Sequence, residues 1–351
     1  MLRQMKIIKV ILLLMLSVIL IGCANDTTPV LGCDVESTLL LNAAAYENYD
    51  NKYVYDAFAS YYSNSVDKDN DCFDALAITD DNYEVVLRSQ SEKSNTDFVI
   101  LYGDEFDEVV DTVAADHFSS KYIYIENSSD NPNVYSLDFD DYQLGYLAGV
   151  ASAISAKSNN GDNFLYLASA SDDLSGYRGY LAGISSHIGS ANVILLQQSS
   201  TEAGLQSVES LIGEVYNTSE IYSTYAPAFH LDSYLVEKLK QVNDSYQSYL
   251  IGYGFDQYLS VLLADGESVY LTSVIKNYES AFATFFNKYL NNTIQGGSVH
   301  GYNFGILNDG ISIELTENRN LSAQEISAIT EIISAIKGGS LVVSDEQITN
   351  N

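Results

Sequence analysis

The chain has 351 residues and a formal net charge of −31 at pH 7. Nucleic acid and anionic lipid surfaces repel such an acidic protein, so the charge argues against both as partners. The acidic residues are spread along the chain, which is typical of a solvated surface and not of an acidic interaction tail. The length is sufficient for two domains of ordinary size, each with a buried core.

The first 22 residues have the layout of a secretory signal peptide. Arg3, Lys6 and Lys9 precede an uncharged apolar run over residues 10–22, which is short for a membrane-spanning helix. We therefore expect residues 1–22 to be removed. Because this segment carries three basic residues and no acidic ones, its removal takes the net charge from −31 to −34.

The apolar run ends in Leu20-Ile21-Gly22-Cys23. This tetrapeptide resembles the bacterial lipobox, in which a small residue precedes a cysteine that is lipidated and becomes the new N-terminus. The alternatives are a signal anchor, or an ordinary cleaved signal followed by a chance cysteine. We expect lipidation of Cys23, with residues 23–33 as a lipidated tether that holds the folded body at the extracytoplasmic face of the cell membrane.

Cys33 and Cys72 are the two cysteines that follow Cys23. Each comes just ahead of an apolar run that we predict to be a strand, at 37–45 and at 73–78. If these strands are parallel neighbours, both cysteines lie at the same edge of one sheet. In a compartment where disulfides persist, this favours a Cys33–Cys72 disulfide over two free thiols.

The rest of the chain alternates short apolar runs with longer amphipathic ones, the pattern of a parallel sheet covered by helices. Strands are predicted at 37–45, 73–78, 97–102, 122–126, 163–168, 192–197, 248–253 and 269–273. Helices are predicted at 52–62, 105–116, 142–155, 176–187, 204–215, 231–240, 278–289 and 323–336. The number of elements predicts two α/β units, and the absence of a Gly/Ser linker predicts several short crossings between them.

Motifs for catalysis and for metal binding are absent from the sequence. The four histidines are scattered and form no zinc or triad pattern. The segment Gly183-Ile184-Ser185-Ser186-His187 lacks the glycine that a nucleophile elbow needs two residues after its serine. Residues 67–71 open like a calcium loop, but Cys72 stands where the tight turn needs glycine, so a solvated acidic turn is the better interpretation. We predict a protein that is not an enzyme and has no cofactor or metal.

Two glycine patterns have a direct structural meaning. In the predicted helix that starts at 142, Gly145, Ala148 and Gly149 fall at helical spacings, which predicts close packing against a neighbouring helix. Gly252 and Gly254 stand at the carboxyl end of a predicted strand. They are expected in a loop that lines a crevice at the carboxyl edge of a sheet, where open α/β sheets bind their ligands.

Four segments carry a resemblance to a known family. They are Asn133-Val134-Tyr135-Ser136-Leu137-Asp138-Phe139-Asp140-Asp141-Tyr142-Gln143-Leu144-Gly145-Tyr146-Leu147-Ala148-Gly149, Gly179-Tyr180-Leu181-Ala182-Gly183, Ile251-Gly252-Tyr253-Gly254-Phe255-Asp256-Gln257 and Leu271-Thr272-Ser273-Val274-Ile275-Lys276. In this order and spacing they resemble the basic membrane lipoprotein family, the substrate-binding lipoproteins of nucleoside ABC transporters. The resemblance extends through most of the chain beyond residue 23.

The resemblance implies a two-lobed type I periplasmic-binding-protein fold, with a parallel sheet flanked by helices in each lobe. It places residues 34–137 and 274–300 in an N-terminal lobe, and residues 138–273 and 301–345 in a C-terminal lobe. Three crossings would join the lobes. The chain would capture a nucleoside or another small polar solute between them and deliver it to an ABC permease. The alternative is a ligand sensor or partner-binding lipoprotein that has lost nucleoside binding.

By the same resemblance, seven residues are expected to bind the ligand. They are Asp50, Asn51, Tyr53, Gly254, Phe255, Asp256 and Lys276. Lys276 matches the family pattern and can donate to hydroxyl or carboxylate oxygens of an uncharged or anionic solute. The alternative for this residue is a surface salt bridge.

Other pocket positions depart from the family pattern. Val54 falls where the family has a stacking Phe, although Tyr53 or Tyr55 would take this role if the alignment shifts by one residue. Ala45 and Gly254 fall where the family has carboxylates for the base and the ribose. The stretch 198–201 has no counterpart of the second stacking Phe. These losses predict weak or absent binding of purine nucleosides.

Overall fold

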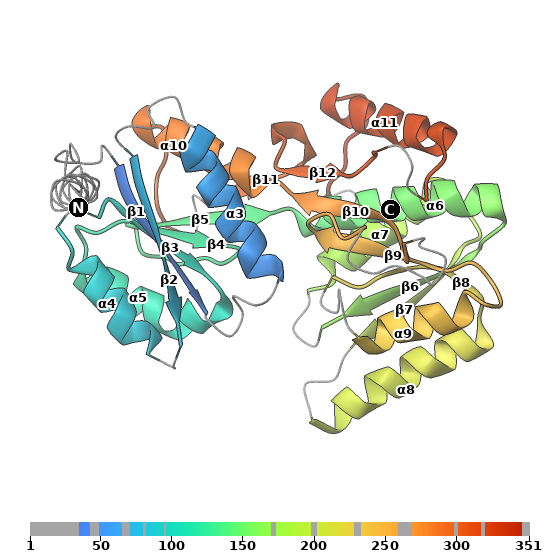
Figure 1. Cartoon of the computed structure of the whole chain (residues 1–351). Helices are drawn as coiled ribbons and strands as arrows, with labels where there is room; N and C mark the ends of the chain where they lie inside the picture. The colour runs from blue at the N-terminus through green and yellow to red at the C-terminus, as the bar shows by residue number, and fades with distance from the viewer. Residues whose placement is uncertain are drawn as a thin grey trace, which may run out of the picture.

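The computed structural model describes residues 35–42, 49–64, 71–79, 82–94, 96–169, 173–197, 202–227, 233–258, 268–297, 301–316 and 320–345. These residues form two α/β lobes that lie side by side (Figure 1). Each lobe contains one six-stranded sheet with helices on both faces. The predicted fold class is confirmed.

The first sheet has the strand order β11-β5-β4-β3-β1-β2, and every pairing in it is parallel. The strands are β1 (Val35–Asn42), β2 (Asp71–Ile78), β3 (Phe98–Tyr102), β4 (Tyr122–Ile125), β5 (Val134–Phe139) and β11 (Tyr302–Phe304). The helices are α3 (Tyr49–Asn64), α4 (Tyr83–Ser91), α5 (Asp107–Asp116) and α10 (Tyr278–Leu290), with a short 3-10 helix η1 (Asp104–Phe106) after β3.

The apolar runs of this sheet serve two cores because consecutive side chains of a strand point to opposite faces. Leu39 and Leu41 pack with α3 and α10, whereas Leu40 packs with residues of α4 and α5. All three leucines are fully buried. The helix pairs accordingly lie on opposite sides of the sheet (Figure 1).

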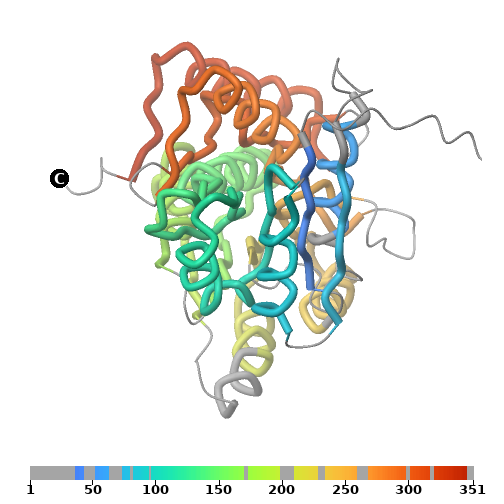
Figure 2. The backbone as a smooth tube through the Cα atoms, turned by 90° about the vertical axis from the view of Figure 1, so that its left-hand side faces the viewer, coloured from blue at the N-terminus to red at the C-terminus, as the bar shows by residue number. Residues whose placement is uncertain are grey.

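The second sheet has the order β12-β10-β9-β8-β6-β7, and only the pairing of β10 with β12 is antiparallel. The strands are β6 (Asn163–Ala168), β7 (Asn192–Gln197), β8 (Ile221–Tyr225), β9 (Tyr249–Gly254), β10 (Tyr270–Lys276) and β12 (Ile311–Ile313). The helices are α6 (Asp141–Asn159), α7 (Ser175–Ser185), α8 (Glu202–Thr218), α9 (Ser233–Val242) and α11 (Ala323–Lys337), with the 3-10 helix η3 (Ile306–Asn308). In Figures 1 and 2, α10 and α11 both lie on the upper side of the molecule.

The close packing that the glycines predict is confirmed between α6 and α7. A Cβ atom on Gly149 would lie 2.2 Å from the carbonyl oxygen of Tyr180, and one on Gly179 would lie 2.0 Å from that of Tyr142. Both distances are far below van der Waals contact. The two helices therefore touch through their backbones, which only glycine permits at these positions.

The chain crosses between the lobes at three places: after β5, after β10 and after β11. Each crossing lies a few residues later than the predicted boundary. Lys276 still belongs to the second sheet, and β11 adds to the first sheet although it falls in the range 301–345 assigned to the other lobe. The third crossing comes late because β11 first pairs with β5, Asn303 opposite Asp138, before the chain enters the second lobe.

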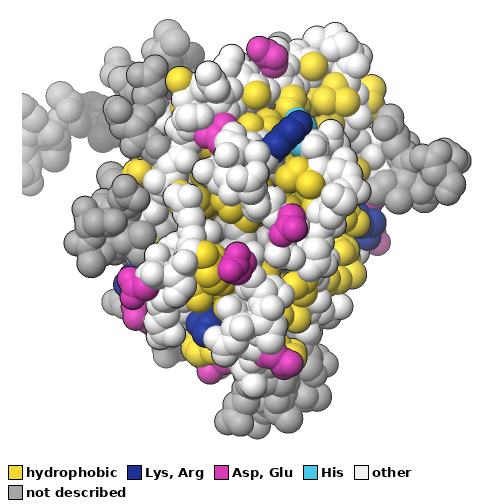
Figure 3. All heavy atoms as spheres, turned by 90° about the vertical axis from the view of Figure 1, so that its right-hand side faces the viewer, with side chains coloured by type: hydrophobic (Ala, Val, Ile, Leu, Met, Phe, Trp, Pro, Cys, Tyr) yellow, Lys and Arg dark blue, Asp and Glu magenta, His cyan; other side chains and the backbone are white. Residues whose placement is uncertain are grey.

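The outer face of the second lobe carries scattered acidic side chains and few basic ones (Figure 3). The acidic side chains do not gather into one patch on this face, as the sequence pattern predicts. Among the described helices, none combines the length and the apolar character needed to cross a bilayer.

Candidate ligand-binding site

A cavity of about 390 Å³ lies between the lobes. Its walls come from both sides: Tyr53, Tyr102, Asp104, Glu126 and Tyr278 from the first lobe, and Pro227, Tyr253, Gly254, Phe255 and Lys276 from the second. Many of these residues stand at or just after the carboxyl end of a strand, because the parallel strands of each sheet end toward the cavity. Its volume is within the range of small-molecule sites, roughly 300–1,000 Å³.

Lys276 is the last residue of β10, and only 6% of its side chain is exposed. Its Nζ atom lies 2.9 Å from Oε2 of Glu126 and 4.5 Å from the ring centroid of Tyr253. Burial acts to lower the pKa of Lys276, but attraction by Glu126 and Asp141 outweighs it and raises the pKa above its usual value. The ammonium group is thus kept charged and is neutralised by Glu126.

Glu126 directly follows β4 and has a positive φ of 61°, which is uncommon for a residue with a side chain. Its backbone N–H donates to the carbonyl oxygen of Leu137 at 2.6 Å. Its carboxylate accepts a hydrogen bond from the hydroxyl of Tyr278 and pairs with Lys276. Sequence reasoning missed Glu126, although an acidic residue at the carboxyl end of the buried run Tyr122-Ile123-Tyr124-Ile125 was a usable signal.

Aromatic rings line much of the cavity and meet across it. The ring centroids of Tyr53 and Phe255, which belong to different lobes, are 5.6 Å apart. Tyr278 packs against Tyr53 at 5.9 Å and against Tyr102 at 6.3 Å. Burial raises the pKa of Tyr53, Tyr253 and Tyr278, so their hydroxyl groups are neutral at physiological pH.

The loop after β9 carries Phe255 into the cavity. Gly254 has a φ of +82° and borders open space, so its backbone turns the chain at the cavity wall. Gln257 anchors this loop, because its backbone N–H donates to Oγ of Ser273 at 3.0 Å. Asp256 does not line the cavity, but its carboxylate accepts from the backbone N–H of Tyr258 and its charge raises the pKa of Tyr53.

The second turn of α3, residues 53–55, decides which aromatic residue faces the cavity. Val54 is fully buried in the core, and Tyr55 packs against Phe73 with ring centroids 5.8 Å apart. Tyr53 is therefore the residue of this turn that lines the cavity. The side chains of Asp50 and Asn51 lie outside the described residues.

Several other sequence predictions concern positions that the structure does not describe. Ala45, the stretch 198–201 and the cysteines at 23 and 33 lie outside the described residues, as does the side chain of Cys72. Their roles stay predictions.

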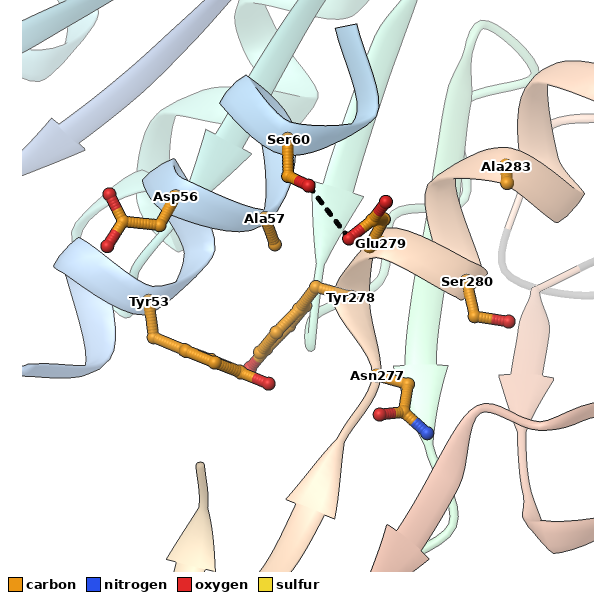
Figure 4. A pocket seen from close by; sticks show the side chains of 9 residues that line it. All are labelled: Tyr53, Asp56, Ala57, Ser60, Asn277, Tyr278, Glu279, Ser280 and Ala283. Atoms are coloured by element: carbon orange, nitrogen blue, oxygen red, sulfur yellow. Dashed lines mark hydrogen bonds between the residues drawn. The ribbon is translucent and has the colours of Figure 1, made fainter. Parts of the chain in front are cut away.

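A second hollow of about 580 Å³ adjoins the cavity and lies between α3 and α10 (Figure 4). Tyr53 and Tyr278 line both spaces and separate them. On the far side of the hollow, the hydroxyl of Ser60 donates to Oε2 of Glu279 at 2.9 Å. In the part of the chain that the structure describes, no group of three or more His, Cys, Asp and Glu side chains is placed to hold a metal ion.

Two α/β lobes whose strands end toward a shared cavity define the fold of solute-binding proteins, and solved structures agree. The chain is similar to an ABC transporter solute-binding protein from Conexibacter woesei DSM 14684, with a TM-score of 0.64 and 14% identity over 89% of this chain and 99% of that chain. A solute-binding protein from Aeropyrum pernix K1 gives a TM-score of 0.62 at 14% identity, over 89% and 94% of the two chains. A transcriptional activator of the comK gene from Bacillus halodurans gives 0.64 at 16% identity, over 88% and 100%. Identities this low show the shared fold alone.

The family is shown by the sequence itself. Residues 47–346 match the model of the ABC transporter substrate-binding protein PnrA-like family, and the chain belongs to this family. The family resemblance found in the sequence is thereby confirmed. No curated protein matches the chain.

Proposed function

We propose that this protein is the membrane-anchored, extracytoplasmic solute-binding lipoprotein of an ABC-type uptake system and is not an enzyme. One observation carries the proposal: the cavity is closed by contacts between the lobes, the Lys276–Glu126 ion pair and the Tyr53–Phe255 ring contact. A solute that enters when the lobes part is enclosed when these contacts form again. Affinity then arises from closure, and reopening at the permease releases the solute.

The proposed ligand-binding residues are Lys276, Glu126, Tyr53, Gly254 and Phe255, all of which line the cavity. The sequence-based candidates also include Asp50, Asn51 and Asp256. Of these, Asp256 acts on Tyr53 from the neighbouring loop without lining the cavity. Membership of the family favours a nucleoside-like solute, but Gly254 stands where the family has the ribose-binding carboxylate, which favours a different one.

The test is to identify the solute that the protein carries. The full-length protein, purified from cells in mild detergent, is measured by native mass spectrometry. We expect a bound small molecule in the wild-type protein and its loss in Glu126→Gln. Arg88→Gln is the control, because Arg88 forms its ion pairs with Glu84 and Asp116, outside the cavity. A protein that never carries or binds a solute would contradict the proposal.

A sensor is the second candidate, because a solved structure with this fold is described as a transcriptional activator. A sensor of this kind binds the same solute but hands its signal to a partner protein. Deleting the gene distinguishes the two functions: uptake of the identified solute falls if the protein serves a transporter, and it is unchanged if the protein is a sensor.

A further inference from the structure

The charges around the cavity do not match an anionic ligand. Two carboxylates, Asp104 and Glu126, line it together with one ammonium group, that of Lys276. Glu126 neutralises Lys276 at 2.9 Å, so this lysine has no uncompensated charge to offer an anion. Asp104 is exposed, and its carboxylate accepts from Nδ2 of Asn127 at 3.1 Å. Within the described part of the chain, Asp104 has no basic partner, so the cavity keeps one net negative charge.

The walls of the cavity attract cations in a second way. Five aromatic rings line it: Tyr53, Tyr102, Tyr253, Phe255 and Tyr278. The face of an aromatic ring carries partial negative charge and binds an ammonium group, most strongly where water is excluded. The ammonium of Lys276 already lies 4.5 Å from the ring centroid of Tyr253. One wall of this cavity therefore holds an ammonium group in the structure itself.

We infer that the solute captured in the cavity is an organic cation, a small molecule with an ammonium or substituted ammonium group, held by Asp104 and the aromatic walls. The inference rests on the proposed function and names its class of ligand. Glu126 and Lys276 cancel one another, so the charge of Asp104 decides which solutes are attracted. The net charge of −31 of the whole chain adds to this, because an acidic protein steers cations toward its surface.

The test compares three probes of nearly the same shape and different charge. They are choline, its neutral carbon analogue 3,3-dimethylbutan-1-ol, and the anion 3,3-dimethylbutanoate. Each is titrated by calorimetry into full-length protein in detergent, after removal of any bound solute. Cation–π attraction in a desolvated site and the nearby carboxylate are each sufficient for a tenfold effect, so we expect choline to bind at least about tenfold more tightly than the neutral analogue. The anion should bind most weakly.

Asp104→Asn is the matching variant. It should lower the affinity for choline by about tenfold and leave the affinity for the neutral analogue unchanged. Asp104 is exposed at the cavity, so this replacement removes charge without disturbing the core. Asp116→Asn is the control for overall charge: it removes one carboxylate at the end of α5, outside the cavity, and should change neither affinity.

The possible failures are distinguishable. The inference of a cationic ligand is wrong if the neutral or anionic probe binds as tightly as choline, or if a neutral or anionic solute co-purifies in the cavity. The proposed function of solute capture stands in both cases. An unchanged preference for choline in Asp104→Asn also overturns the inference. If no probe binds and no solute co-purifies, the proposed function fails together with it.

Discussion

The Nζ atom of Lys276 and the Oε2 atom of Glu126 lie 2.9 Å apart although the two residues belong to different lobes. Lys276 ends a strand of the second sheet, and Glu126 follows a strand of the first. The hydroxyl of Tyr278, at the start of α10, donates to the same carboxylate. This network lies beside the crossing between β10 and α10, where it stabilises the closed arrangement of the lobes.

The first prediction concerns this ion pair. Glu126→Gln leaves the buried ammonium of Lys276 without its main partner, and breaking a buried pair costs about 3 kcal/mol of unfolding free energy. Asp141, which also attracts Lys276, makes this an upper limit. Urea denaturation at pH 7 measures the change. Glu237→Gln, which breaks the exposed pair with Lys240, should cost less than about 1 kcal/mol. Equal costs for the two variants would contradict the role of Glu126.

The pH dependence follows from the raised pKa of Lys276, in which attraction by Glu126 and Asp141 outweighs the opposing effect of burial. A group with a raised folded-state pKa contributes stability fully below its unfolded pKa, about 10.4 for Lys, and loses it as pH rises through the folded value. The cost of Lys276→Met should therefore be the same at pH 7 and pH 9. A cost that halves over this interval would show that the ammonium loses its proton there.

The second prediction concerns the contact of α6 with α7. A Cβ atom on Gly149 would lie 2.2 Å from the carbonyl oxygen of Tyr180, and a backbone atom cannot move aside as a flexible side chain can. Gly149→Ala should lower the free energy of unfolding by about 3 kcal/mol. Gly189→Ala is the control, because nothing lies within 4 Å of its added Cβ atom. Unfolding of both variants at the same urea concentration would contradict the close backbone contact of α6 with α7.

The sequence was sufficient for the fold because the elements that build it are strongly patterned. Buried runs such as Phe98-Val99-Ile100-Leu101 and the glycines of α6 each have one structural interpretation. The predictions missed α4, in which the apolar Val85 is exposed while the polar Gln90 and Ser91 are buried. The predicted strands also omit β5 and β8, in which polar residues such as Asp138 and Ser223 interrupt the apolar run. They omit β11 and β12 as well, because three residues are too few to show any periodicity.

The site was less predictable than the fold. Tyr53 faces the cavity and Val54 the core, and a shift of one residue on a helix, about 100°, separates these outcomes. The partner of Lys276 is Glu126, which is 150 positions earlier in the chain. Only the pairing of strands within each sheet, and the crossing that joins the lobes, brings these two residues together. No local pattern contains that information.

The third prediction concerns the membrane anchor. Cys23 stands at the end of a lipobox-like segment and lies outside the described residues. Replacing it by Ala should release the protein from membranes, because a lipid chain and not the protein body holds it there. Fractionation of cells into membrane and soluble parts measures this, with Cys72→Ala as the control that should stay on the membrane. Continued membrane retention of Cys23→Ala would mean that the apolar run itself is the anchor.

The fourth prediction is the Cys33–Cys72 disulfide. The backbone register of β1 and β2 sets Cys72 opposite Glu36, three positions beyond Cys33. A disulfide needs Cα atoms within about 7 Å, whereas three extended residues span about 10 Å, so the bond requires the chain to turn ahead of Val35. Thiol titration of the unfolded, unreduced protein should find neither cysteine free. Two reactive thiols from this pair would exclude the bond.

A closed loop of about forty residues should stabilise the protein by roughly 3–4 kcal/mol in the chain-entropy model. Reduction of the intact protein should therefore shift its urea midpoint downward. A double variant with Ala at both positions should match the reduced protein and be insensitive to reductant. If reductant shifts this double variant as well, its effect does not come from this disulfide.

The last prediction concerns purine nucleosides. The family resemblance places Gly254 and Ala45 where carboxylates bind the ribose and the base, and Gly254 lines the cavity without a side chain. Tyr53 supplies a ring for stacking in place of Val54, so stacking is kept. The departure that remains is the loss of two hydrogen-bonding carboxylates. Each loss costs about 1–3 kcal/mol of binding free energy, so the two together weaken nucleoside binding by roughly 30-fold or more.

We therefore expect weak or absent binding of inosine, guanosine and adenosine in calorimetric titrations of the full-length protein. Gly254→Asp is the informative variant, because it returns a carboxylate to the cavity wall, although the φ of +82° makes an Asp there strained. It should strengthen nucleoside binding if the mapping of the pocket is right. If the wild-type protein binds a purine nucleoside with a Kd below 1 μM, and Lys276→Ala abolishes this binding, the mapping of the pocket is wrong and nucleoside uptake is the function.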